Sequence, residues 1–156
     1  MTKSIAKPVA VATLVCGTLD VIYPTTVTLL RGKDPAAMWR GVASGPFPGA
    51  SAWGTPGTIA GLAVHFTLMA IMVAAYMLVA RARPGLLERP WLSGIGYGLV
   101  TYVVMNLVVL PLRFGTPLPP PALSIATQLV AHILLVGLPI AFIARKYLAD
   151  GSPASA

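Results

Sequence analysis

The sequence carries little charge and very little negative charge. Of its 156 residues only four are Asp or Glu, against eleven Lys and Arg, and charged residues make up 10% of the total. Soluble domains carry about 25% charged residues, so a fold that faces water on all sides is excluded. The basic residues form no long run, which favours the lipid bilayer as a partner and argues against nucleic acid.

Cysteine and familiar catalytic motifs are equally scarce. Cys16 is the only cysteine, so a disulfide within the chain and a cysteine-based zinc site are excluded. The sequence contains no Ser-His-Asp order, phosphate-binding loop, pair of carboxylates or zinc motif. It therefore predicts no catalytic residue and no metal site, and it leaves enzymatic activity undecided while leaning against it.

Long apolar stretches dominate what is present. Four of them exceed the length of about 20 residues that crosses a bilayer, and they cover residues 8–30, 56–80, 90–112 and 121–147. We therefore expect an all-α fold, an integral membrane four-helix bundle that forms one domain over residues 1–148. The small polar residues 149–156 are expected to form a disordered tail.

The connection between the first two spans has a helix-start signal of its own. Asp34 precedes Pro35, an N-cap residue followed by proline at the first helical position, which predicts a short helix over residues 35–44. Met38 and Trp39 stand beside Arg40 in this helix, a mixture suited to the lipid headgroups. The sequence therefore predicts an interfacial helix between the first and second spans.

The basic residues also predict an orientation. Cytoplasmic loops carry an excess of Lys and Arg, and the side of the two termini holds seven of these residues against four on the other side. The seven are Lys3, Lys7, Arg81, Arg83, Arg89, Arg145 and Lys146, and the four are Arg31, Lys33, Arg40 and Arg113. Both termini are therefore expected in the cytoplasm.

Each predicted span holds strongly polar side chains at a similar depth. Counted at about 1.5 Å per residue, they fall about 9 to 17 Å below the boundary opposite the termini. A polar group that faces lipid is costly, so we expect these groups to meet at the centre of the bundle as a ligand-binding site or a polar network. They are Asp20, His65, Asn106, Gln128 and His132, and the third span also holds Tyr102.

The second and fourth spans share a pattern. Each has one His within an apolar run and basic residues at its end, at His65 and at His132. The first and third spans both end near a Leu-Arg pair. This pattern favours a duplicated two-helix hairpin with a pseudo-twofold axis along the membrane normal.

Two segments carry a resemblance to a known group of proteins. DPAAMWRGVASGPFPGASAWGTPGTIAGLAVHF and GIGYGLVTYVVMNLVVLPLR resemble small four-helix bacterial inner-membrane proteins of uncharacterised function, the YagU-like proteins, over about residues 17–113. The Val-Ala-Ser-Gly run, His65-Phe66 and Met105-Asn106 are the recognisable pieces. The resemblance implies a multi-pass protein of the bacterial inner membrane and brings no mechanism.

Several functions are compatible with the polar layer. It can be a structural network that fixes helix packing, or a site for the binding or transport of a small solute or proton. His65 and His132 could instead be the two axial ligands of a b-type haem, although no cofactor is predicted by a motif. The small size and Gly-rich faces also suit an accessory subunit of a larger membrane complex or a homo-oligomer. The binding or transport of a small solute or proton is the function that we expect.

Overall fold

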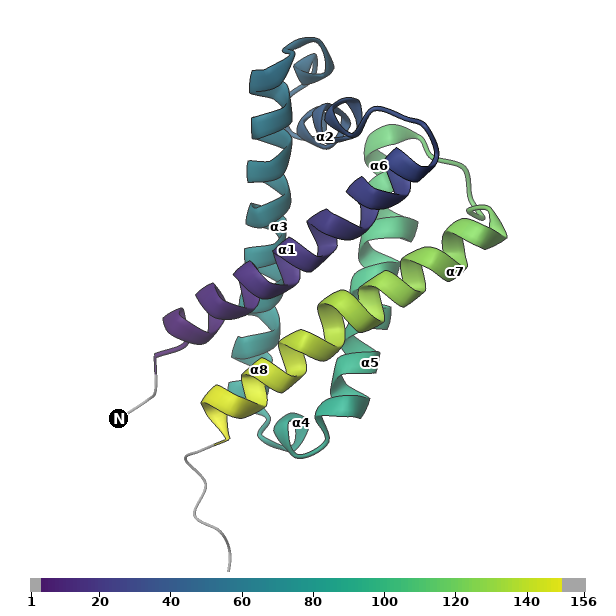
Figure 1. The fold of residues 1–156 in the computed structure, drawn as a ribbon. Helices are drawn as coiled ribbons and strands as arrows, with labels where there is room; N and C mark the ends of the chain where they lie inside the picture. Colours follow the sequence, from purple (N-terminus) through teal and green to yellow (C-terminus); the bar gives the residue numbers. More distant parts are fainter. Residues whose placement is uncertain (1–3, 150–156) are drawn as a thin grey trace, which may run out of the picture.

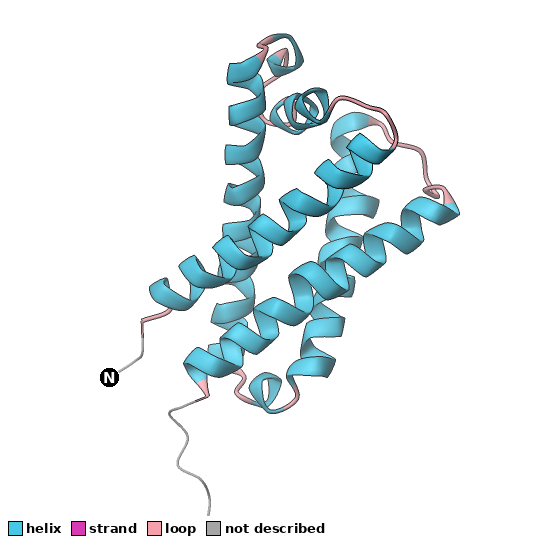
Figure 2. Ribbon diagram, viewed as in Figure 1, coloured by secondary structure: helices cyan, strands magenta, loops and turns pink. Residues whose placement is uncertain are grey.

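The computed structural model describes residues 4–149, and every regular element in that range is helical. Figure 2 shows helices joined by short loops from one end of the described chain to the other. The predicted all-α class is confirmed. Of the tail expected to be disordered, residues 150–156 lie outside the described range.

Four helices are long and apolar enough to cross a membrane, as expected for a multi-pass membrane protein. The first two are α1 (Ala6–Leu30) and α3 (Thr55–Ala82). The third runs through α5 (Pro90–Tyr102), the π-helical segment η2 (Val103–Val109) and α6 (Leu110–Phe114). The fourth runs through α7 (Ala122–Ala131), the π-helical segment η3 (His132–Gly137) and α8 (Leu138–Leu148).

The four spans form a bundle in which the first and fourth lie side by side. Figure 1 shows α1 next to α7 and α8, with α3 and α5 behind them. Helix α1 packs on α3 and α8, and α5 packs on η3 and α8. The short helix α4 (Gly85–Glu88) joins α3 to α5 near the end of α8, and α2 (Pro35–Ala43) lies at the opposite end. We call these the α4 end and the α2 end.

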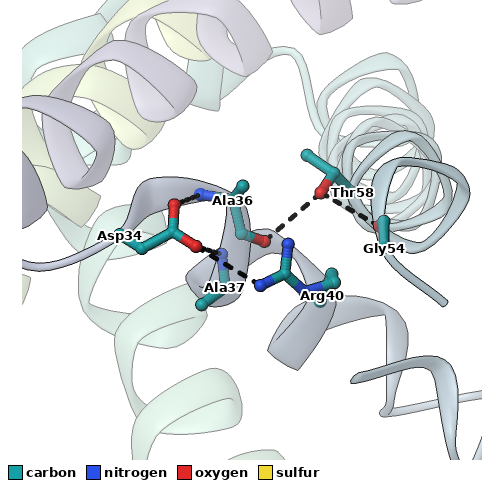
Figure 3. Close-up of polar contacts among 6 residues, drawn as sticks. All are labelled: Asp34, Ala36, Ala37, Arg40, Gly54 and Thr58. Carbon is teal, nitrogen blue, oxygen red and sulfur yellow. Dashed lines mark hydrogen bonds and ion pairs between the residues drawn. The ribbon is translucent and has the colours of Figure 1, made fainter. Parts of the chain in front are cut away.

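Helix α2 begins where the sequence predicts and is tied to α3. The Asp34 carboxylate accepts hydrogen bonds from the backbone N–H groups of Ala36 (2.8 Å) and Ala37 (3.1 Å), and it lies 3.3 Å from Arg40 Nη2. Figure 3 shows this cap beside Thr58, whose hydroxyl lies 3.4 Å from the Ala36 carbonyl oxygen. An N-cap of this kind stabilises a helix by about 1 kcal/mol.

Glycines set the closest helix contacts. Gly61 of α3 lies against the backbone of Trp39 in α2, and a Cβ added there would overlap the Trp39 carbonyl group. A Cβ added at Gly98 of α5 would lie 2.7 Å from the His132 carbonyl oxygen. The motifs Gly57-x-x-x-Gly61 and Gly94-x-x-x-Gly98 thus allow close helix approach. For the first motif, the partner is the short helix α2.

Both π-helical segments stand just before a proline. Segment η2 ends two residues before Pro111, and η3 ends two residues before Pro139. Proline has no N–H group and its ring clashes with the carbonyl four residues earlier, so a wider turn accommodates it without breaking the span. These wide turns contain Asn106 and His132.

The apolar core fills the half of the bundle nearer α4. Cys16 of α1, Met69 and Val73 of α3, and Ile140 of α8 are among its fully buried members. In α1 the core reaches Cys16, and in α3 it begins at Met69. Asp20 and His65 therefore lie about one helical turn beyond the core, toward the α2 end.

Candidate functional site

The first polar group in the spans is formed by Asp20 and His65. Asp20 Oδ2 lies 4.0 Å from His65 Nδ1, and the two side chains are 23% and 14% exposed. On its other side the imidazole Nε2 lies 3.2 Å from the carbonyl oxygen of Gly17. No hydrogen bond reaches the Asp20 carboxylate from any residue between 4 and 149, so its oxygens keep capacity to bind a proton or a donor group.

Helix α2 covers the imidazole of His65 with an aromatic side chain. The ring of Trp39 packs edge-on against the His65 ring, with centroids 5.4 Å apart, and Trp39 is only 6% exposed. Trp39 Nε1–H donates to the hydroxyl of Thr25 in α1 at 3.2 Å. We predicted Trp39 at the lipid headgroups, and that placement was wrong. Gly61 lets α2 approach α3 closely enough to bury the indole.

The second polar group lies between the third and fourth spans. The rings of Tyr102 and His132 pack edge-on with centroids 6.0 Å apart. His132 Nδ1 lies 2.9 Å from the Gln128 carbonyl oxygen, and Asn106 Nδ2–H donates to the Tyr102 carbonyl oxygen at 3.3 Å. Tyr102, Asn106 and His132 are buried. Their polar atoms mainly bond to the backbone of their own helices, which is typical of a structural role.

The structure divides the predicted layer into these two groups. Asp20 and His65 come together, as do Tyr102, Asn106 and His132. Gln128 contacts His132 through its backbone carbonyl oxygen. Within residues 4–149 no hydrogen bond, ion pair or aromatic contact connects one group to the other. The pair with an uncompensated carboxylate, Asp20–His65, is therefore the candidate site.

The haem hypothesis fits this geometry poorly at His65. An axial ligand must present a free ring nitrogen to iron. Both nitrogens of His65 face oxygen atoms, Nδ1 toward Asp20 and Nε2 toward Gly17. Binding haem at His65 would therefore require the loss of one of these contacts, whereas His132 has only its Nδ1 engaged.

Sequence reasoning missed two contributors to the site. Thr25 and Trp39 belong to it because α2 folds back onto α1 and α3, a contact between segments that no local pattern encodes. A third observation concerns Thr13, on the same face of α1 as Asp20. Its hydroxyl oxygen is buried and has no hydrogen-bond partner among residues 4–149. A buried polar atom without a partner marks a place where a water or ligand can bind.

Fold and site together define an α-helical chain with four potential membrane spans and a carboxylate–imidazole pair within them. No family model, curated protein or solved structure matches the chain.

Proposed function

We propose that this protein binds protons at the Asp20–His65 pair and transports them, alone or with a small polar solute, across the membrane. The observation that carries the proposal is the carboxylate of Asp20 facing the imidazole of His65 at 4.0 Å inside two apolar spans. Ionisable side chains within a span are costly, and they characteristically lie on ion and proton pathways.

The hydrogen-bond partners of His65 support a single proton site. The Gly17 carbonyl can only accept, so the hydrogen bond at Nε2 requires a proton on that nitrogen. The remaining nitrogen, Nδ1, then faces the Asp20 carboxylate. When neither Nδ1 nor the carboxylate carries a proton, a lone pair of the imidazole faces a lone pair of the carboxylate. One additional proton on either group gives an attractive contact, so the pair can load and release one proton.

The surroundings of the pair support regulated access. Trp39 covers the imidazole from the α2 end, and it is held there by Thr25. On the α4 side of the pair, the hydroxyl of Thr13, which has no partner among residues 4–149, lies on the same face of α1 as Asp20. We infer that a proton or solute reaches the pair past Trp39.

Proton binding is tested by infrared difference spectroscopy of the reconstituted protein during a pH titration. A protonated carboxyl group gives a C=O stretch separate from the amide bands. We expect one component of this band to titrate in the wild type and to be missing in Asp20→Asn, whereas the other carboxyl groups of the chain titrate in both proteins. Asp34→Asn is the matched control, because Asp34 lies in a loop and asparagine still caps α2.

Transport is tested with liposomes that enclose a pH-sensitive dye and receive an acid pulse. We expect proton uptake in the wild type and in Asp34→Asn, and uptake equal to that of protein-free liposomes in Asp20→Asn. If no component of the titrating carboxyl band is lost in Asp20→Asn, the pair is a structural contact and the proposal fails. A titrating band without uptake would limit the function to proton or solute binding.

We further propose that the protein resides in a bacterial inner membrane with both termini in the cytoplasm. Lys7, the basic residues of the α3–α5 connection and the basic end of α8 lie at the α4 end, which supports this orientation. Kinship with the YagU-like proteins and the duplicated hairpin stay predictions of the sequence, as does assembly into a homo-oligomer or a larger complex.

A further inference from the structure

An apolar groove of about 620 Å³ lies between α3 and α5 at the α4 end, away from both polar groups. Its walls include Ala75 and Val79 of α3, Leu86 of α4, and Leu92, Gly96 and Val100 of α5. Tyr76 and Tyr97 hold the walls apart, because their rings pack against each other between the helices with centroids 4.9 Å apart.

The polar atoms of the groove are already engaged. Tyr76 donates to the Ser93 hydroxyl at 2.9 Å, and Ser93 donates to the Leu86 carbonyl oxygen at 2.8 Å. Tyr97 donates to the Met72 carbonyl oxygen at 2.6 Å. Apart from Arg89, the groove therefore presents hydrocarbon to an occupant, which selects an apolar chain over a polar solute.

One end of the groove is cationic. Arg89 lines it, Arg81 lies in the last turn of α3, and Arg83 is the C-cap residue of that helix. These three arginines form no salt bridge within residues 4–149, although the acidic Glu88 precedes Arg89. Arginine binds phosphate by paired hydrogen bonds, so this end suits an anionic headgroup.

The length of the groove matches one leaflet of a bilayer. On α5 its lining runs from Arg89 to Val100, which corresponds to about 16 Å of helix. The hydrocarbon core of a bilayer is about 30 Å thick, so one leaflet contributes about 15 Å. A lipid whose phosphate lies at Arg89 would therefore place an acyl chain along the whole groove.

We propose that this groove is a binding site for an anionic phospholipid, with one acyl chain between α3 and α5 and the phosphate at Arg89. Arg81 and Arg83 add attraction for the negative headgroup. The site is independent of the Asp20–His65 pair and does not rest on the proposed transport function.

Native mass spectrometry of the detergent-purified protein tests the site with phosphatidylglycerol and phosphatidylcholine of identical acyl chains. We expect one phosphatidylglycerol to bind about tenfold more tightly than phosphatidylcholine, because phosphatidylcholine balances the same phosphate with a choline cation that the arginines repel. Arg89→Ala should remove this preference. Gly96→Leu should weaken the binding of both lipids, because a side chain at Gly96 meets no atom within 4 Å and extends into the groove.

Two controls separate the groove from general lipid attraction. Lys146→Ala removes a charge from the same end of the bundle, and Leu134→Phe enlarges an exposed apolar side chain elsewhere. Neither should change binding. Val100→Trp is a second groove-filling variant for the case in which Gly96→Leu is poorly folded, since Val100 is exposed and lines the groove.

Three results would overturn the proposal. Equal binding of both lipids by the wild type would mean that the groove does not select charge. If Arg89→Ala removes the preference for phosphatidylglycerol but neither groove-filling variant weakens lipid binding, the lipid is attracted at the surface and does not enter the groove. Equal losses in Arg89→Ala and Lys146→Ala would indicate that net charge alone attracts the lipid.

Discussion

The surroundings of His65 come from three helices. Gly17 and Asp20 approach it from α1, Trp39 comes from α2, and the imidazole itself belongs to α3. The sequence identifies His65 and Asp20 as costly residues within apolar spans. It does not identify Trp39 as their neighbour, because an indole beside an arginine is equally typical of a headgroup anchor.

The burial of Trp39 predicts a protected fluorophore. In the double variant Trp53→Phe/Trp91→Phe only Trp39 emits, and its emission should be quenched by aqueous iodide much less than that of Trp53. The reason is that Trp39 is 6% exposed, whereas Trp53 is 46% exposed in the loop before α3. The measurement is a Stern–Volmer titration of the reconstituted protein.

The matched control is the variant Trp39→Phe/Trp91→Phe, in which only Trp53 emits. Equal quenching constants for the two tryptophans would contradict the inward position of α2. They would favour the headgroup position that the sequence alone predicts.

At the scale of the helices, packing depends on which glycines face a neighbour. Gly94 and Gly98 face the fourth span, while Gly96, between them in sequence, faces the open groove. The pattern Gly-x-x-x-Gly signals close approach, but it names no partner. The π-helical turns are similar, because the prolines predict irregular helices and only the fold shows that Asn106 and His132 lie in the wide turns.

This difference predicts opposite effects for two neighbouring substitutions. Gly98→Ala should destabilise the protein by about 1 to 3 kcal/mol, the usual cost of overpacking, because the new Cβ would lie 2.7 Å from backbone atoms of the fourth span. Gly96→Ala should be neutral or stabilise by up to about 1 kcal/mol, since its Cβ meets nothing and alanine favours the helix.

Thermal unfolding in detergent, followed by circular dichroism, measures both changes. The wild type and the two variants should share the same helix content before melting. If Gly96→Ala melts lower than Gly98→Ala, the packing between the third and fourth spans is not as described.

At the scale of the whole molecule, charge and polarity are distributed along the bundle axis. Basic residues lie at the α4 end, near the start of α1 and the end of α8. The two polar groups lie nearer the α2 end, beyond the apolar core. This asymmetry supports the proposed orientation, in which the α4 end faces the cytoplasm.

Cysteine labelling in intact bacterial cells checks that orientation. Ser51→Cys, at the α2 end, should react with a membrane-impermeant maleimide applied outside. Glu88→Cys, at the α4 end, should react only after the cells are permeabilised, since both positions are exposed but on opposite sides. The wild type is the control, because Cys16 is fully buried and should remain unlabelled. The reverse labelling pattern would mean that the α4 end faces outside and that the proposed orientation is wrong.

The sequence by itself determined the helical class, the four potential spans and the start of α2. Apolar length, proline position and N-capping act within one segment, so they can be predicted locally. Only the tertiary structure decided that Asp20 pairs with His65, that Trp39 covers His65, and that His132 forms a separate group with Tyr102. Depth along a helix follows from counting residues. The direction in which each polar side chain points depends on how the helices rotate and pack against one another, and glycines far apart in the chain set that packing.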